Sequence, residues 1–245
     1  MLNYLRIAII FLIALVPSVV GAESVLMLRD DGSELQIQPA LEAAGHTVTD
    51  GGRYDAWDGI TPSVSDFDVV VFLNAWEYGY PLLPAAATAL QDYVAGGGGI
   101  VMTEWTAYDV CHQAKGPVVA ALIPVTMPNC SDYGEVETWT VTDPAHPLTA
   151  GVPASWIDNA GWSTVTPKLD SIVVVTGAGG NAMVSYSRAS GGVVVHLNHD
   201  MIYSTASIHP NALQLMVNAA EFASVNIFAD GFESGGDTMW SSSAP

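Results

Sequence analysis

Gly96-Gly-Gly-Gly-Ile-Val-Met-Thr-Glu104-Trp105 is the stretch that decides the fold of this chain. It predicts a glycine turn, then a short buried strand, and then polar and aromatic residues where the strand ends. In open α/β sheets, ligands bind beyond the carboxyl ends of the strands. The side chain just past this strand is therefore a prime candidate for chemistry. Here it is Glu104, an acid rather than a thiol or hydroxyl nucleophile.

Strands and helices alternate on both sides of this stretch. The strongest strand pattern is Asp66-Phe-Asp-Val-Val-Val-Phe-Leu73, which is β-branched and continuous, as buried parallel strands tend to be. Further strands are expected at 24–29, 46–49 and 135–142, and helices at 34–44, 82–95 and 209–223. Late strands are expected at 171–176, 182–186 and 192–197, joined by glycine-rich turns that favour hairpins. The pattern predicts an α/β fold with a mostly parallel central sheet and antiparallel late strands.

Residues 1–22 have the features of an export signal. Arg6 precedes an apolar run from Ile7 to Val16, and small residues up to Ala22 offer a cleavage site. We expect cleavage there and export to the periplasm or the extracellular space, with no stable membrane insertion afterwards. The alternative is that the apolar run is retained as an N-terminal anchor.

The rest of the chain divides into an α/β domain over residues 23–224 and a flexible C-terminal tail over 225–245. The tail contains Phe228-Ala-Asp-Gly-Phe-Glu-Ser-Gly235 and Trp240-Ser-Ser-Ser-Ala-Pro, which are turn-rich and serine-rich. It resembles a brief C-terminal motif found on many unrelated exported bacterial proteins. That resemblance implies a role in export or attachment rather than catalysis. The alternative is that the acidic residues of the tail bind Ca²⁺, although they miss the spacing of a calcium hand.

The charge balance excludes several classes of partner. Six Lys and Arg residues stand against 25 Asp and Glu residues, which gives a formal net charge of −19. Nucleic-acid binding needs basic patches that neutralise phosphate, so we expect no nucleic-acid partner. Anionic lipid surfaces are disfavoured for the same reason. The charge favours cations, or neutral ligands such as sugars.

The two cysteines, Cys111 and Cys130, both lie in the less regular segment 106–134. An exported protein meets an oxidising compartment, so the expected state is a disulfide between them. The bond would close a loop of about 20 residues and stabilise the fold by roughly 3 kcal/mol. The alternative is a free catalytic thiol at Cys111.

Four phrases of the sequence carry a family resemblance. They are Asp66-Phe-Asp-Val-Val-Val, Leu90-Gln-Asp-Tyr-Val-Ala-Gly-Gly-Gly-Gly-Ile-Val, Asp143-Pro-Ala-His-Pro-Leu-Thr-Ala-Gly-Val-Pro and Gly192-Val-Val-Val-His-Leu-Asn-His199. In this order and spacing they resemble the trehalose-utilisation (ThuA-like) family, a branch of the class I glutamine amidotransferase-like superfamily, over residues 24–224. The resemblance implies a flavodoxin-like three-layer sandwich with a pocket at the carboxyl ends of the central strands.

The resemblance also assigns a position to the superfamily nucleophile. In the amidotransferases a cysteine follows the strand that comes after the glycine turn, and ThuA-like proteins typically have a histidine there. In this chain that position falls at Glu104, so the resemblance does not support glutamine hydrolysis. The late Gly-His of ThuA-like proteins corresponds to Asn198-His199, which keeps the histidine. No cofactor is expected.

Four strand exits should converge if the sheet is wound in this way. They bring together Asp30, Asp31, Asn74, Trp76, Tyr78, Glu104, Trp105, His199 and Asp200. We expect Glu104 and His199 to do acid–base work, because a carboxylate near a histidine can act as general base and acid. The aromatic rings would stack on a sugar ring, and the other residues would line the pocket. The sequence thus predicts a domain that binds a small, carbohydrate-derived ligand, with hydrolase-like or isomerase-like activity if it is an enzyme.

Structural roles for the same residues are the alternative. Glu104 can cap the helix that follows it, and His199 can be a hydrogen-bonded structural histidine. The protein would then be a non-catalytic binding or scaffold module that lacks the superfamily nucleophile. Glu104 and His199 could also ligate a metal together with Asp30 or Asp31. No HxxxH or HxxE spacing supports that site, so we expect no metal.

Overall fold

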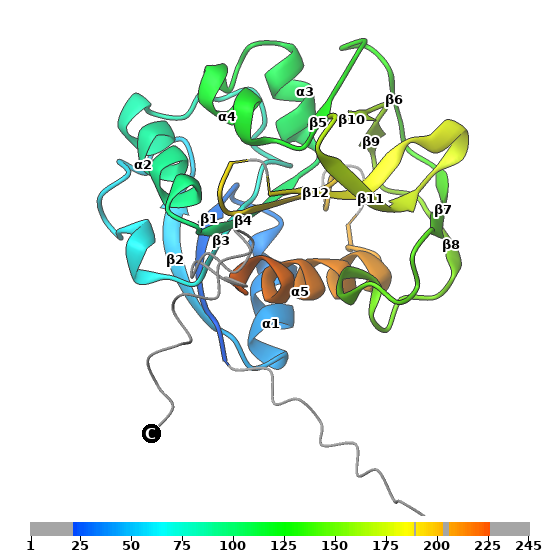
Figure 1. Ribbon diagram of the computed structural model, residues 1–245, viewed down its shortest axis with the longest axis horizontal. Coiled ribbons are helices and arrows are strands. Elements are labelled where there is room, and N and C mark those ends of the chain that lie inside the picture. The colour runs from blue at the N-terminus through cyan, green and yellow to red at the C-terminus, as the bar shows by residue number, and fades with distance from the viewer. Residues whose placement is uncertain (1–21, 189, 203–205, 226–245) are drawn as a thin grey trace, which may run out of the picture.

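A computed structural model of the chain describes residues 22–188, 190–202 and 206–225. In this part of the chain a nine-stranded sheet has the strand order β2-β1-β3-β4-β13-β12-β11-β7-β8. Helices lie on both of its faces (Figure 1). The predicted export signal up to residue 21 and the tail from residue 226 lie outside the described residues, and so does the calcium alternative. None of the helices in the described segments is long and apolar enough to cross a membrane.

One half of the sheet is parallel. It consists of β2 (Thr47–Arg53), β1 (Ser24–Arg29), β3 (Val69–Phe72), β4 (Gly99–Thr103) and β13 (Val193–Leu197), in that order. Every neighbouring pair among these strands is parallel, so all five end at the same edge. Each residue of β3, β4 and β13 is buried, which accounts for sequences that are apolar except for Thr103 in β4 and His196 in β13.

The other half of the sheet is antiparallel. It adds β12 (Ala182–Ser187), β11 (Ser171–Thr176), β7 (Glu137–Val141) and β8 (Ser155–Asp158). Two short sheets pair β10 (Thr166–Pro167) with β5 (Val125–Thr126) and β6 (Tyr133–Gly134) with β9 (Trp162–Ser163). The predicted antiparallel late strands are confirmed. The parallel pairs make up half of the sheet rather than most of it, because β7 and β8 extend its antiparallel side.

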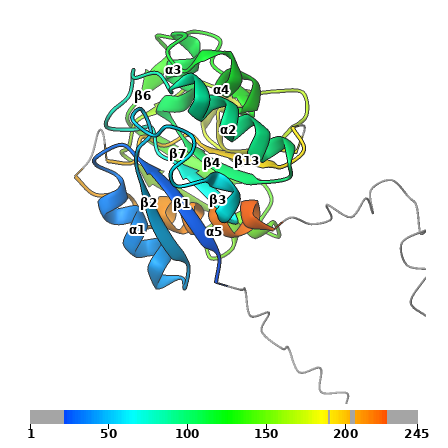
Figure 2. The same ribbon diagram turned by 90° about the vertical axis from the view of Figure 1, so that its left-hand side faces the viewer.

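The helices form the outer layers of an α/β sandwich. They are α1 (Glu34–Ala43), α2 (Pro84–Ala95), α3 (Trp105–Cys111), α4 (Gly116–Leu122) and α5 (Pro210–Ser224), with short 3₁₀ turns η1 (Val64–Asp66), η2 (Pro147–Thr149) and η3 (Ala178–Gly180). Helices α1 and α5 cover one face, and α2, α3 and α4 cover the other (Figures 1 and 2). Side chains alternate across β1 accordingly: Met27 packs in the core that contains Ile37 of α1, and Leu28 in the core that contains Leu90 of α2.

The glycine run lets β4 begin in close contact with its neighbours. A Cβ atom at Gly99 would lie 2.0 Å from the carbonyl oxygen of Ala223, near the end of α5. A Cβ atom at Gly192 would lie 1.9 Å from the carbonyl oxygen of Gly98. Both positions therefore require glycine. The predicted turn and strand are confirmed, and Glu104 follows β4 directly.

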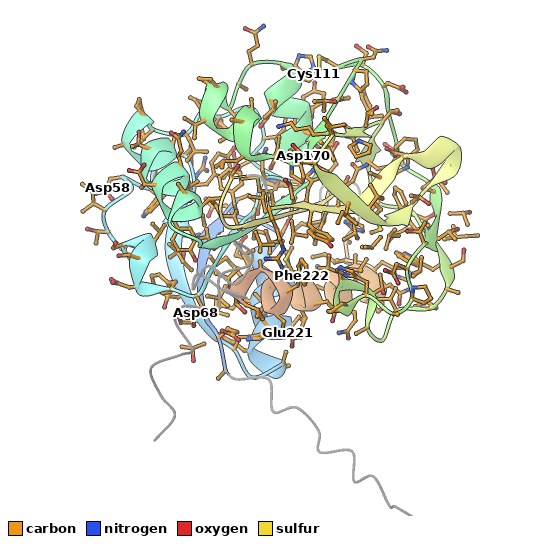
Figure 3. The ribbon with its side chains drawn as sticks, viewed as in Figure 1. Asp58, Asp68, Cys111, Asp170, Glu221 and Phe222 are labelled. Atoms are coloured by element: carbon orange, nitrogen blue, oxygen red, sulfur yellow. A yellow bond between two sulfur atoms is a disulfide. The ribbon has the colours of Figure 1, made fainter. Side chains whose placement is uncertain are left out.

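The segment 106–134 is more ordered than its sequence suggests, because it contains most of α3 and all of α4. Each of these helices has seven residues, too few for a helical periodicity to stand out. The predicted disulfide is confirmed: Cys111 is bonded to Cys130, with their Cα atoms 5.6 Å apart. Figure 3 shows Cys111 on the opposite side of the molecule from Glu221 and Phe222 of α5.

Candidate functional site

Buried polar residues follow four parallel strands at one edge of the sheet. These residues are Asp30 after β1, Asn74 after β3, Glu104 after β4, and Asn198, His199 and Asp200 after β13, and each has at most 1% of its surface exposed. Buried polar groups at the carboxyl ends of parallel strands mark the usual position of a ligand site in an α/β sheet. The predicted convergence of strand exits therefore exists in the structure.

Glu104 is completely buried at this edge. It occupies the N-cap position of α3, but its side chain makes no capping hydrogen bond. Neither carboxyl oxygen has a hydrogen-bond partner among the described residues. The Ser163 hydroxyl interacts with the carboxyl, but the contact falls outside hydrogen-bonding geometry. The predicted alternative of a helix-capping carboxylate is thus not what the structure contains.

The surroundings of Glu104 favour its uncharged form. Burial raises the pKa of the carboxyl to about 8; Ser163 lowers that pKa, and the nearby charges of Asp200 and Asp109 raise it. At neutral pH the group is therefore mostly protonated. A buried neutral carboxylic acid can donate a hydrogen bond or a proton to a bound molecule.

The imidazole of His199 has partners of its own. Its Nδ1 accepts a hydrogen bond from the amide of Met201 at 2.9 Å, so the ring proton is on Nε2. Nε2 donates to Oδ2 of Asp158 at 3.2 Å. Burial raises the pKa of Asp158, but the hydrogen bond from His199 brings that pKa below its ordinary value. No hydrogen bond joins this imidazole to the Glu104 carboxyl in the described part of the chain; the two residues are linked by the Glu104 amide, which donates to the carbonyl oxygen of His199.

Asp30 and Asp31 are neighbours in sequence but have different surroundings. Asp30 is buried and accepts hydrogen bonds from the amides of Ala75 and Trp76 at 2.9 and 2.7 Å, which ties the end of β1 to the exit of β3. Asp31 is exposed and has a positive φ of 59°. It pairs with Arg29 and Arg53 at the surface. Asp30 is therefore an organising residue of the site, and Asp31 belongs to its ionic rim.

Asn74 is hydrogen-bonded to a buried ion pair formed by Asp109 and Lys115. Its amide donates to Oγ1 of Thr103 at 2.7 Å, and its Nδ2 donates to Oδ2 of Asp109 at 2.9 Å. The same carboxylate oxygen lies 2.9 Å from Nζ of Lys115, whose side chain is fully buried. Burial lowers the pKa of Lys115, and the charge of Asp109 opposes that shift. The exit of β3 is thus connected to α3 and to the start of α4 by a continuous polar network.

An aromatic cluster lies beside Glu104. The ring of Trp105 stacks on Tyr78, with centroids 5.2 Å apart and planes 26° apart. Tyr108 meets both rings edge-on, and Tyr133 lies 6.3 Å from Trp105 and from Tyr108. Trp105 is 7% exposed, Tyr78 36% and Tyr133 57%, so the cluster extends from the buried edge of the sheet to the surface.

Comparison with known proteins places this geometry in a structural group. No protein-family model and no curated protein matches the chain. A cytoplasmic protein of Salmonella typhimurium superposes with a TM-score of 0.62 at 18% identity, over 82% of this chain and 98% of that chain. Two proteins described as ThuA-like superpose with TM-scores of 0.61. The protein from Bacteroides uniformis is 17% identical, and the match covers 80% of this chain and 89% of that chain. The protein from Parabacteroides merdae is 12% identical, and the match covers 84% of this chain and 91% of that chain.

The chain has a ThuA-like fold. At these identities the likeness shows the fold alone. Within the ThuA-like fold of this chain, Glu104 occupies the position that follows the glycine turn and β4. Both cysteines lie elsewhere and are bonded to each other, which contradicts the alternative of a free catalytic thiol at Cys111.

The residues of the ThuA-like fold described here do not assemble a metal site. They contain no group of three or more His, Cys, Asp or Glu side chains that could hold a metal ion. The sequence-based alternative of Glu104 and His199 with Asp30 or Asp31 is therefore not formed in this part of the chain. The imidazole of His199 is hydrogen-bonded to Asp158, and the carboxylate of Asp30 accepts hydrogen bonds from backbone amides.

Four residues of the site have no counterpart among the sequence predictions: Asp109, Lys115, Asp158 and Ser163. A signal was available for Lys115, since it is one of six basic residues in a very acidic chain and has no basic neighbours. Asp158 lies 41 residues from its partner His199, and no local pattern links the two. The topology of the sheet, rather than sequence spacing, brings these residues to the site.

Proposed function

We propose that the chain is an exported member of the ThuA-like family, with a flavodoxin-like domain that binds a small, neutral, polyhydroxylated ligand at the carboxyl ends of β1, β3, β4 and β13. Glu104 acts in its protonated form, as hydrogen-bond donor to the ligand and as general acid if turnover occurs. The main support for this proposal is that the Glu104 carboxyl is completely buried and has no hydrogen-bond partner among the described residues. Such a group in a native structure calls for a partner that a bound molecule can supply.

Further buried polar atoms around this edge support a polar ligand. The Ser163 hydroxyl, which interacts with Glu104, has no hydrogen-bond partner among the described residues, and neither does Oδ1 of Asn74. A sugar hydroxyl can donate to one such group and accept from another. Each unpaired buried group costs the folded protein free energy, which a matching ligand recovers on binding.

The aromatic cluster supports a ligand with an apolar ring face. Tyr78 and Tyr133 are exposed where the cluster reaches the surface, and Trp105 connects them to Glu104. Sugar rings present C–H groups on their faces and hydroxyl groups at their edges, which suits an aromatic wall beside a polar floor. The acidic composition of the chain disfavours anionic ligands.

Export is part of the proposal and rests on the sequence of residues 1–22 together with the Cys111–Cys130 disulfide, which is typical of oxidising compartments. Expression of the whole gene product in a bacterium, followed by N-terminal sequencing of the protein outside the cytoplasm, tests it. Glu23 as the first residue is the expected result. Protein that stays in the cytoplasm with Met1 in place would contradict export.

Ligand binding is tested by titrating the purified protein with glucose, galactose, xylose, N-acetylglucosamine and trehalose in a calorimeter. Binding of at least one of these sugars is the expected result. Glu104→Gln should keep the affinity, because the amide also donates a hydrogen bond, whereas Glu104→Ala should weaken it about tenfold or more. Leu169→Ala, at a side chain that is 98% exposed, serves as the control. Equal affinities of the wild type and Glu104→Ala would exclude Glu104 from the binding site.

The non-catalytic binding module is the second candidate. The engagement of His199 by Asp158 and the Met201 amide favours it, because both ring nitrogens of the histidine expected to act with Glu104 already have other partners. Hydrolysis of the corresponding p-nitrophenyl glycosides separates the two candidates. Turnover by the wild type that Glu104→Gln abolishes would support the general acid, and binding without turnover would support the module.

A further inference from the structure

The loop that follows β3, residues 74–80, presents aromatic side chains at the surface beside the candidate site. Trp76 is 51% exposed, Tyr78 36% and Tyr80 48%. Exposed aromatic residues gathered on one short loop are a feature of recognition surfaces, because large rigid rings supply contact area at a low cost in conformational entropy.

The first part of this loop is held by a buried carboxylate. Asp30, which is completely buried, accepts hydrogen bonds from the amides of Ala75 and Trp76 at 2.9 and 2.7 Å. Asn74, the first residue of the loop, donates from its own amide to Oγ1 of Thr103 at 2.7 Å. Three consecutive amides are thus fixed by Asp30, which follows β1, and by Thr103 of β4.

The second part of the loop is held by the buried ion pair. Asp109 accepts from the amide of Gly79 at 2.9 Å, and Nζ of Lys115 donates to the carbonyl oxygen of Tyr80. The hydroxyl of Tyr54 donates to the carbonyl oxygen of Glu77 and accepts from Lys115 at 2.7 Å. The loop backbone is therefore anchored at both ends by buried side chains, while its three aromatic side chains stay partly exposed.

A loop with a fixed backbone binds with little loss of entropy, because its ordering takes place during folding. The loop is also continuous with the candidate site, since Tyr78 stacks on Trp105 beside Glu104. The guanidinium of Arg53 lies 5.5 Å from the centroid of the Tyr80 ring and is paired with Asp31, Asp55 and Glu77. Acidic side chains outnumber basic ones in this group of ion pairs, which disfavours an anionic ligand and leaves an uncharged ligand with apolar faces as the better match for the aromatic rings.

We propose that the 74–80 loop is a preformed platform for the further sugar units of a neutral oligosaccharide whose terminal unit occupies the Glu104 site. This inference rests on the proposed function and adds the class of ligand: a chain of sugar units rather than a single sugar. Trp76 and Tyr80 provide the platform, and Asp30, Asp109 and Lys115 are positioning residues for it.

Calorimetric titration with oligosaccharides of increasing length tests the platform. The purified protein is titrated with gluco-, xylo- and chito-oligosaccharides of one to five units. In one of these series the affinity should rise roughly fivefold or more between the disaccharide and the tetrasaccharide, as expected for an added ring contact. Trp76→Ala and Tyr80→Ala should each remove this gain, and Tyr80→Ala should leave the affinity for the monosaccharide unchanged. Tyr80→Phe, which keeps the ring, should retain the gain.

The outcomes separate this inference from the function on which it rests. Monosaccharide binding with no gain from further units would overturn the platform and leave the ligand site intact. A gain that persists in both Trp76→Ala and Tyr80→Ala would also overturn it. Failure of every sugar, monosaccharides included, to bind would overturn the ligand site and the platform together. Thermal melting of each variant identifies any loss of affinity that comes from unfolding.

Discussion

The amide of Glu104 donates a hydrogen bond to the carbonyl oxygen of His199 at 3.4 Å, while no hydrogen bond joins the two side chains among the described residues. The imidazole is held by Asp158 and by the amide of Met201. The carboxyl of Glu104 stays unpaired among the described residues and close to two other acids. Of these two residues, Glu104 is the one whose side chain has no hydrogen-bond partner among the described residues.

The stability of the protein should depend on pH through Glu104. Its pKa is about 8 in the folded state, against 4.5 for an ordinary Glu, so between these values the folded state binds a proton that the unfolded state releases. This contribution to stability is complete below pH 4.5 and is lost as pH rises through 8. The side-chain amide of the Glu104→Gln variant does not titrate in this pH range. The stability of this variant relative to the wild type should therefore increase by a few kcal/mol between pH 5 and pH 9.

Urea unfolding at pH 5, 7 and 9 measures this difference. Glu42→Gln, at an exposed residue of α1, is the control and should follow the wild type at each pH. A constant difference between Glu104→Gln and the wild type at all three pH values would show that Glu104 titrates normally.

The Asp158–His199 pair should act as a structural unit. His199→Ala leaves a buried carboxylate oxygen without its donor, and the expected loss is about 2–4 kcal/mol of unfolding free energy. Asp158→Ala should cost a similar amount. The double variant should lose clearly less than the two single losses combined, since each single change already breaks the interaction. Additive losses in chemical denaturation would mean that the two residues are not coupled.

Lys115→Met should destabilise the protein by about 3–5 kcal/mol, because it leaves Asp109 charged and buried without a cation. Adding Asp109→Asn removes that charge and should recover part of the loss. Lys168→Met is the matched control: Lys168 is partly buried and bonds to the carbonyl oxygens of Ala120 and Ala121, with no carboxylate to leave behind. Denaturant unfolding compares the variants, and equal losses for Lys115→Met with and without Asp109→Asn would contradict the ion-pair account.

The glycine run should tolerate a methyl group at one end and reject it at the other. Gly99→Ala would place its Cβ 2.0 Å from the carbonyl oxygen of Ala223, so β4 and α5 would have to separate. The expected loss is roughly 2–4 kcal/mol. At Gly96 the nearest atom is 3.3 Å from an added Cβ, and φ is −80°. Gly96→Ala should therefore change the melting temperature little, and a similar drop for both variants would be inconsistent with this contact.

Much of the fold could be predicted from sequence, because the buried parallel strands are continuous apolar runs. The 66–73 pattern contains β3, and the stretch after the glycine run is β4. Helices α3 and α4 could not be predicted, since each has only seven residues and their burial depends on packing against other elements. The strand β8 cannot be predicted for a related reason: its four residues join the sheet only as an edge strand beside β7.

The candidate site was predictable in its position but not in its connections. Glu104 was identified because it follows a buried strand in a sheet with parallel strands. The partner of His199 could not be identified, because Asp158 lies on β8, at the far edge of the antiparallel half. Lys115 and Asp109 are six residues apart and meet only because α3 ends and the chain turns back into α4. Such contacts depend on tertiary packing.

The most direct test of the central claim is the titration of the Glu104 side-chain carboxyl carbon by ¹³C NMR, with Glu104→Gln used to assign its signal. The account predicts a midpoint near pH 8, so that the group is uncharged at neutral pH in the folded protein. A midpoint near 4.5, the ordinary value for Glu, would show a charged carboxylate and contradict the proposed role as hydrogen-bond donor and acid.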